Sequence, residues 1–210
     1  MKTTIAAVAV LSVVCTVWAA ETPPPKSGQP LKLFNGKDLA GWAFSGEAVK
    51  GAWSVKDGVM HNAGRPGGYI RTEKTFTNYR LSMEFRHLSK GNGGVLLRAQ
   101  APDKVWPRSI ECQGMVANVG DIWNIDQFPM TVDPARTSGR RTQKLAASNE
   151  KPMGEWNTYE ITLNRGDLEI RVNGLLQNSA AGCWETPGWV CLQSEGAEME
   201  FRNVVLTPIE

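Results

Sequence analysis

The feature that most constrains this chain is an alternation of apolar and polar residues between Asn78 and Gln113. A period of two is typical of β-strands that turn one face toward a core. The pattern predicts three strands, with apolar positions at Tyr79, Leu81, Met83, Phe85, Val95, Leu97, Ile110 and Cys112. We interpret the intervening acids, bases and amides as one polar sheet face, formed by Glu84, Arg86, Arg98, Glu111 and Gln113.

The rest of the chain also predicts short strands separated by turns. Residues 53–60 form a hairpin pattern around Asp57-Gly58, and residues 156–174 alternate on both sides of an Arg-Gly-Asp turn. The segments 188–196 and 199–209 are the last two expected strands. No amphipathic helix is evident, so we expect an all-β sandwich of two antiparallel sheets. With 210 residues in the chain, we treat 31–210 as a single domain.

The segment from Gly114 to Pro152 shows no sustained period but contains several aromatic residues. A long irregular segment within a compact domain is usually functional or disordered, and the aromatic residues argue against disorder. We therefore expect loops with one or two short strands that cover a sheet edge or the functional site.

The first twenty residues have the pattern of a secretory signal peptide. Lys2 precedes an apolar run that is too short to span a membrane, and Ala19-Ala20 offers a cleavage site. Residues 21–30 are a proline-rich linker. We expect a periplasmic or extracellular protein, and lipidation at Cys15 is disfavoured because Val14 precedes it.

Three cysteines remain in the mature chain after the signal peptide is removed. If a disulfide forms, we expect it between Cys183 and Cys191, whereas Cys112 should face the core. No zinc-site spacing is present. The formal net charge of +2 gives no electrostatic case for nucleic acid as a partner. The eight tryptophans suit either a β core or a sugar-binding surface.

Several motifs along the chain occur in an order that resembles one known family. They are LFNGKDLAGW, WSVKDGVM, NYRLSMEFR, GNGGVLLR, SIECQ, KPMGEWNTYEI, VNG and LQSEGAEMEFRNVVL. The series resembles the 3-keto-disaccharide hydrolase domain family over essentially the whole mature domain. The resemblance implies a concanavalin-like jelly roll, export from a bacterium and a small carbohydrate substrate. It implies cleavage of 3-keto-glycosides, whose C3 hydroxyl has been oxidised to a ketone.

A ketone at C3 acidifies the proton at C2, so a base can form an enolate and the C1 substituent can leave by elimination. This chemistry requires a base, a group that stabilises the enolate oxygen and an acid for the leaving oxygen. We expect Glu111 to be the acid or base and Arg98 to give electrostatic support. Each has a structural alternative: Glu111 as a solvated strand residue, and Arg98 in a cross-strand salt bridge.

Other polar residues are candidates for substrate binding. Amides carry both a donor and an acceptor for sugar hydroxyls, and tryptophan can stack on a sugar ring. The candidates are Gln113, Asn92, Asp121, Trp123, Lys144 and Gln193. Turn chemistry is the alternative for Asn92, core packing for Trp123 and simple solvation for Lys144.

No cofactor is expected, and we predict no metal-binding residues. A divalent metal stays an open alternative with Asp121, Asp126 and Asp133 as oxygen donors, although their spacing matches no calcium loop. The second functional hypothesis is a carbohydrate-binding module without catalysis, because the same sandwich architecture hosts both kinds of protein. The sequence fixes no oligomeric state.

Overall fold

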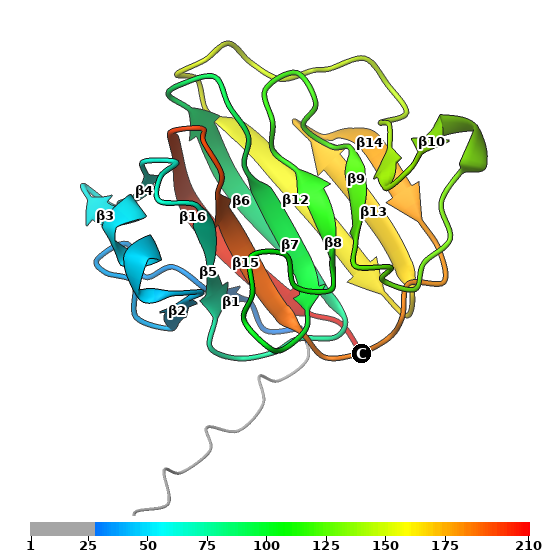
Figure 1. Ribbon diagram of the computed structural model, residues 1–210, viewed down its shortest axis with the longest axis horizontal. Helices are drawn as coiled ribbons and strands as arrows, with labels where there is room; N and C mark the ends of the chain where they lie inside the picture. The colour runs from blue at the N-terminus through cyan, green and yellow to red at the C-terminus, as the bar shows by residue number, and fades with distance from the viewer. Residues whose placement is uncertain (1–27) are drawn as a thin grey trace, which may run out of the picture.

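The computed structural model describes residues 28–210 as two antiparallel β-sheets of eight strands each, packed face to face (Figure 1). The expected signal peptide and most of the expected linker lie outside the described residues. The two-sheet sandwich predicted from the alternating pattern is confirmed. Besides the strands, the structure has two short 3-10 helices, η1 (Glu47–Ala52) and η2 (Pro134–Arg136). None of the helices in 28–210 is long and apolar enough to cross a membrane.

The first sheet, sheet A, contains the longest strands of the molecule. Its order is β14 (Leu175–Ala180), β13 (Asp167–Val172), β12 (Asn157–Asn164), β6 (Tyr79–His87), β16 (Met199–Pro208), β4 (Val59–Asn62) and β3 (Trp53–Lys56), and β1 (Leu31–Lys32) pairs with β16. β3 and β4 form the predicted hairpin, in which Asp57 and Gly58 have positive φ angles of 51° and 77°. The turn therefore has the left-handed residues that a two-residue hairpin requires.

The second sheet, sheet B, holds the residues of functional interest. Its order is β10 (Thr137–Ser138), β11 (Arg141–Thr142), β9 (Ile122–Ile125), β8 (Ser109–Gln113), β7 (Gly94–Ala99), β15 (Trp189–Ser194), β5 (Gly68–Thr72) and β2 (Trp42–Phe44). The irregular segment 114–152 contributes β9, β10 and β11 to one edge of this sheet. It therefore extends the sheet rather than lying only across it.

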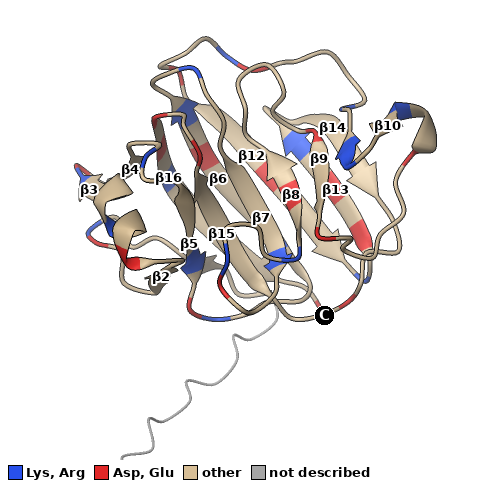
Figure 2. Cartoon of the chain, in the orientation of Figure 1, with Lys and Arg blue, Asp and Glu red and all other residues tan. Residues whose placement is uncertain are grey.

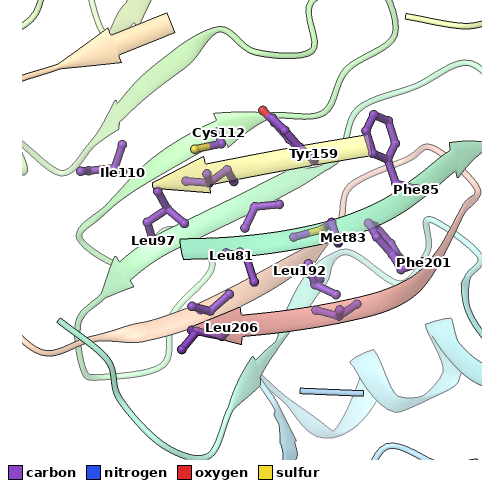
Figure 3. Packing of buried hydrophobic residues seen from close by; sticks show 14 of the residues in the cluster. Leu81, Met83, Phe85, Leu97, Ile110, Cys112, Tyr159, Leu192, Phe201 and Leu206 are labelled. Atoms are coloured by element: carbon purple, nitrogen blue, oxygen red, sulfur yellow. The ribbon is translucent and has the colours of Figure 1, made fainter. Parts of the chain in front are cut away.

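The core fills the layer between the two sheets. Figure 3 shows side chains of β6, β12 and β16 facing those of β7, β8 and β15, and the labelled residues are all at most 2% exposed: Leu81, Met83, Phe85, Leu97, Ile110, Cys112, Tyr159, Leu192, Phe201 and Leu206. Among them, Leu81, Met83, Phe85, Leu97, Ile110 and Cys112 are positions that the period of two assigned to the core. Cys112 faces the core as expected, and Cys112, Cys183 and Cys191 are all unbridged. Burying so much apolar surface is the main favourable term for the sandwich.

One prediction about the polar residues is wrong. β6 belongs to sheet A, while β7 and β8 belong to sheet B, so their outward side chains lie on opposite outer faces of the sandwich. Glu84 and Arg86 form ion pairs with Arg202 and Glu200 of β16, the second with 2.6 Å between nitrogen and oxygen. The alternation identified the faces within each strand, but it carries no information about which strands share a sheet.

Basic and acidic residues are interspersed over the described part of the chain (Figure 2). Most of the ion pairs there join exposed or half-buried side chains, such as Lys50 with Glu47 and Lys104 with Asp126. Surface pairs of this kind contribute little to stability. The interspersed charges agree with the low net charge.

Candidate active site

Glu111 occupies the centre of the outer face of sheet B. It follows the alternation of β8, so its side chain points away from Ile110 and Cys112 in the core. Leu96 of β7 and Trp123 of β9 are its neighbours across the sheet. The side chain is only 3% exposed although it lies on an outer face, so other groups must cover it. The alternative of a solvated strand residue is therefore ruled out.

Burial raises the pKa of Glu111 to about 8. Desolvation is the largest cause, since a buried carboxylate loses its water shell. The negative charge of Glu195 raises the pKa further, while the positive charge of Arg140 and a hydrogen bond from Gln193 partly offset the shift. A carboxyl group with such a pKa is mostly protonated at neutral pH and can donate a proton.

A hollow of about 160 Å³, the central hollow, opens over Glu111. Its polar lining comprises Asn92, Glu111, Gln113, Arg140 and Glu195, and its apolar lining comprises Trp106, Trp123 and Ile125. A few convergent polar groups with aromatic walls are typical of small-molecule sites. The lining comes from five separate parts of the chain, so only the folded sandwich brings it together.

Glu195 is the second carboxyl group of the central hollow. It follows β15 directly and is half-buried, and burial raises its pKa as well, with a hydrogen bond from Asn92 acting in the opposite direction. Gln193 donates from Nε2 to Oε2 of Glu195 at 3.3 Å. Gln193 therefore interacts with both carboxyl groups, although Glu111 is much more deeply buried than Glu195.

Gly94 leaves the space that this arrangement needs. It lies on β7, between β8 and β15. A Cβ atom at this position would lie 2.5 Å from Oε1 of Gln193 and 2.9 Å from the carbonyl oxygen of Cys112. Glycine thus lets the amide of Gln193 lie across β7 toward Glu111.

Arg140 supplies the positive charge of the central hollow. Its guanidinium lies 5.5 Å from the ring centroid of Trp123, and within residues 28–210 it forms no ion pair with a carboxylate. It precedes β11, at the edge of sheet B. An unpaired guanidinium beside two carboxyl groups can bind an oxygen that gains negative charge.

The loop 100–108 covers part of the central hollow and brings Trp106 to it. Asp103 anchors this loop, because it accepts hydrogen bonds from the hydroxyl of Tyr69 at 3.0 Å and from Arg71 Nε at 2.9 Å. Lys104 pairs with Asp126 at 2.9 Å on the other side. The covering segment is thus this loop rather than the whole of 114–152, which contributes Trp123 and Arg140 to the walls.

Arg98 does not reach the central hollow, which corrects the expectation that it supports Glu111. Its φ angle is +48°, and the pairing of β7 with β15 shifts register beside it, so the side chain leaves the alternation. The buried guanidinium donates to the carbonyl oxygens of Thr77, Cys183 and Trp184 and to Oδ1 of Asn78. Arg98 joins three segments at one end of the sandwich and has a structural role.

Asp121 and Lys144 are also outside the central hollow. Asp121 is 1% exposed and accepts hydrogen bonds from Arg141 Nε at 2.7 Å and from the backbone nitrogen of Lys144 at 2.8 Å. The ammonium group of Lys144 donates to the carbonyl oxygen of Ala117 and to Ser148. Through these hydrogen bonds, both residues stabilise the segment after β8. The turn before β9 directs the side chain of Asp121 toward β11.

The remaining predicted binding residues do gather around Glu111. Gln113, Asn92 and Trp123 line the central hollow, and Gln193 lies beside it. Oε1 of Gln113 accepts hydrogen bonds from the backbone nitrogens of Gly114 and Met115, which leaves its NH₂ group for a ligand. Among the described residues, Oδ1 of Asn92, Nε1 of Trp123 and Oε1 of Gln193 are buried without a hydrogen-bond partner. Unpaired buried polar atoms are costly, which is consistent with a site whose ligand completes the network.

Sequence reasoning did not assign Trp106, Arg140 or Glu195 to the site. Trp106 and Arg140 lie in segments without a regular alternation of apolar and polar residues, so the sequence did not indicate where their side chains point. Glu195 lies two residues after Gln193, so the alternation gives both side chains the same outward direction. This alternation was the signal that could have identified Glu195. Within 28–210, no group of three or more His, Cys, Asp and Glu side chains is placed to hold a metal ion.

Comparisons with known proteins point to one family. A family model described as the 3-keto-alpha-glucoside-1,2-lyase-like domain matches residues 29–207. A 3-keto-disaccharide hydrolase from Bacteroides thetaiotaomicron is 27% identical over 155 residues, which cover 66% of this chain and 53% of that protein. This chain thus spans about half the length of the curated relative that it matches.

Solved structures support the same fold. A candidate glycosyl hydrolase from Parabacteroides distasonis is 25% identical with a TM-score of 0.64, and the match covers 86% of this chain and 94% of the other. A β-glucanase from Bacillus licheniformis is 10% identical with a TM-score of 0.61, with coverage of 89% and 100%. At that identity the second likeness shows the fold alone. The concanavalin-like jelly roll expected from the sequence is confirmed.

Proposed function

Since this chain belongs to the 3-keto-alpha-glucoside-1,2-lyase-like domain family, we propose that it is an enzyme that cleaves 3-keto-glycosides in the central hollow. The observation that carries the proposal is the pair of carboxyl groups, Glu111 and Glu195, that line this hollow beside Arg140. A binding module needs aromatic platforms and amides only. Two carboxyl groups in unlike environments are the arrangement that proton transfer requires.

The unlike environments of the two carboxyl groups suggest their separate roles. Glu111 is almost fully buried and is protonated at neutral pH, so it is the acid that protonates the leaving oxygen at C1. Glu195 is more exposed, and as a carboxylate it removes the proton from C2. The aromatic walls formed by Trp106 and Trp123 hold the sugar ring between them.

Glu111 and Glu195 account for both proton transfers of the proposed reaction. The C2–H bond breaks and its proton goes to Glu195, while the C1–O bond breaks and the leaving oxygen takes the proton of Glu111. A double bond forms between C1 and C2, which yields an unsaturated 3-keto sugar. Water then adds across this bond, with hydroxide at C1 and a proton at C2, to complete hydrolysis. Arg140 stabilises the negative charge that develops on the C3 oxygen after C2 is deprotonated.

The test compares a 3-keto-disaccharide with its unoxidised parent in heavy water. We expect turnover of the keto substrate only, and we expect deuterium at C2 of the released sugar. Equal turnover of the parent compound would contradict the proposal, because its C2 proton is not acidic. Keto-substrate cleavage with no deuterium at C2 would refute the elimination route and favour direct displacement.

Export is a second part of the proposal. It rests on the sequence pattern of residues 1–20. The mass of the protein recovered from a bacterial host tests it: we expect a mature chain that begins at Glu21 and is found outside the cytoplasm. Recovery of the full-length chain in the cytoplasm would contradict export without affecting the proposed chemistry.

A further inference from the structure

The central hollow is not isolated on the outer face of sheet B. A hollow of about 570 Å³ lies on the side of β9. Another, with the same volume as the central hollow at about 160 Å³, lies on the side of β5. We call them the large hollow and the side hollow. The large hollow shares Trp106, Ile125 and Arg140 with the central hollow, and the side hollow shares Trp106 and Glu195 with it. The large hollow is lined from β9, the central hollow from β8 and β9, and the side hollow from β15 and β5, and this is the order of the strands in sheet B, so the three lie in one row.

Trp106 contributes to all three hollows. It is 41% exposed, which is unusual for so large an apolar side chain, and the anchored loop 100–108 holds it over the sheet. An aromatic ring at the junction of adjacent hollows can contact consecutive rings of one ligand. Monomer-sized ligands would use only a part of this surface.

The composition of the outer two hollows also suits sugar rings. The large hollow combines Met130 and Phe128 with the polar groups of Asn124, Gln127 and Lys104. In the side hollow, Tyr69 and Val105 are the apolar walls, and Gln193 and Ser194 are the polar ones. Sugar rings have apolar faces and hydroxyl edges, so each hollow offers contacts to both.

Size sets the number of rings. At about 160 Å³, the central hollow lies below the range of roughly 300–1,000 Å³ that holds drug-sized ligands, so it takes a single ring. We propose that the row of hollows binds an oligosaccharide of three or more units, with the reacting unit in the central hollow and its neighbours in the large and side hollows. This inference rests on the proposed function for the position of the reacting unit. The substrate then extends on both sides of the reacting ring rather than ending at a disaccharide.

Calorimetric titration of the wild-type protein with unoxidised gluco-oligosaccharides of one to four units tests this inference. These ligands lack the C3 ketone, so binding is measured without turnover. An α-1,4-linked series and a β-1,4-linked series form two arms that distinguish the linkage. In one arm we expect affinity to rise by about threefold or more with each unit up to three. Equal affinity for one and three units in both arms, or no measurable binding, would overturn the inference, while cleavage of a 3-keto-disaccharide would leave the proposed function intact.

Two variants and a matched control locate the effect. Gly67→Leu adds a side chain at the rim of the side hollow, where a Cβ has 3.7 Å of clearance to the carbonyl oxygen of Ser194. We expect it to remove the gain from the third unit, whereas Ser179→Leu, on β14 of sheet A, should keep the wild-type length dependence. Trp106→Ala removes a wall that all three hollows share, so it should weaken binding of every length, and of the longer ligands most. Circular dichroism confirms folding of each variant, and an unchanged length dependence in folded Gly67→Leu and Trp106→Ala would contradict the proposed row.

Discussion

Glu111 and Glu195 line the same hollow, and the negative charge of Glu195 raises the pKa of Glu111. They come from β8 and from the residue after β15, which β7 separates in the sheet. Two carboxyl groups that influence each other titrate as a pair, so the first proton to leave makes the second harder to remove. This relationship makes the division into an acid and a base testable by titration.

Removing the charge of Glu195 should lower the pKa of Glu111. In Glu195→Gln the like charge is lost while the shape is kept, so ionisation of Glu111 becomes easier. The titration of Glu111 can be followed by NMR of a ¹³C-labelled carboxyl group. Glu198→Gln is the control, since Glu198 pairs with His61 at 2.8 Å. An identical Glu111 pKa in wild type and Glu195→Gln would disprove the coupling.

The rate of cleavage should fall on the alkaline side of pH 8. Glu111 is protonated below its pKa of about 8 and ionised above it, and only the protonated form can donate to the leaving oxygen. A pH profile of kcat from pH 6 to 10 measures this limb. A rate that rises steadily to pH 10 would show that Glu111 acts as an ionised base instead.

Glu111 should also reduce stability at high pH. The group titrates at 4.5 in a model peptide and at about 8 in the folded protein, so between these values only the unfolded chain releases the proton. Its contribution to stability is therefore fully present below pH 4.5 and is lost as pH rises toward 8. One pKa unit corresponds to about 1.4 kcal/mol, so at pH 9 we expect Glu111→Gln to gain at least about 1 kcal/mol over wild type.

Urea denaturation at pH 5 and pH 9 checks this expectation. At pH 5 the difference between Glu111→Gln and wild type should be much smaller than at pH 9, because the wild-type carboxyl group is then neutral in the folded state. The same difference at both pH values would indicate that burial of the carboxylate carries no cost.

Arg98→Leu should destabilise the fold by about 3 kcal/mol or more, since hydrogen bonds to charged groups contribute about 1.5–3 kcal/mol each and several carbonyl oxygens would lose their donor. The affected acceptors lie in three segments, at Thr77, Cys183 and Trp184. Arg98→Lys should recover part of the loss. Urea denaturation measures both variants, and kcat per folded molecule should stay near wild type. A loss of kcat without a change in stability would instead show that Arg98 has a role in catalysis.

The strand positions were predictable because alternation records burial directly. Tyr79, Leu81, Met83 and Phe85 of β6 and Ile110 and Cys112 of β8 face the core as their period requires. Sheet membership was not predictable in this way. Glu84 and Glu111 have the same outward pattern, but one lies on sheet A and the other on sheet B, since pairing between distant strands leaves no local signal.

The site was partly predictable for a related physical reason. Glu111, Gln113 and Gln193 lie within regular strands, so the direction of their side chains could be inferred from the alternation of their neighbours. Arg98 also lies within a strand, but its positive φ angle turns its side chain away from the face that the alternation predicts. Trp106 reaches the site through a loop held by long-range contacts of Asp103, which a single sequence does not show.

The most direct test of the central claim is single-turnover cleavage of a 3-keto-disaccharide by Glu111→Gln at pH 7. The amide keeps the shape of the side chain but cannot act as an acid. We expect the cleavage rate to fall by roughly 10²-fold or more, as is typical when a general acid is removed. The dissociation constant of the unoxidised disaccharide should stay close to the wild-type value. A wild-type cleavage rate in the folded variant would contradict the assignment of Glu111 as the catalytic acid.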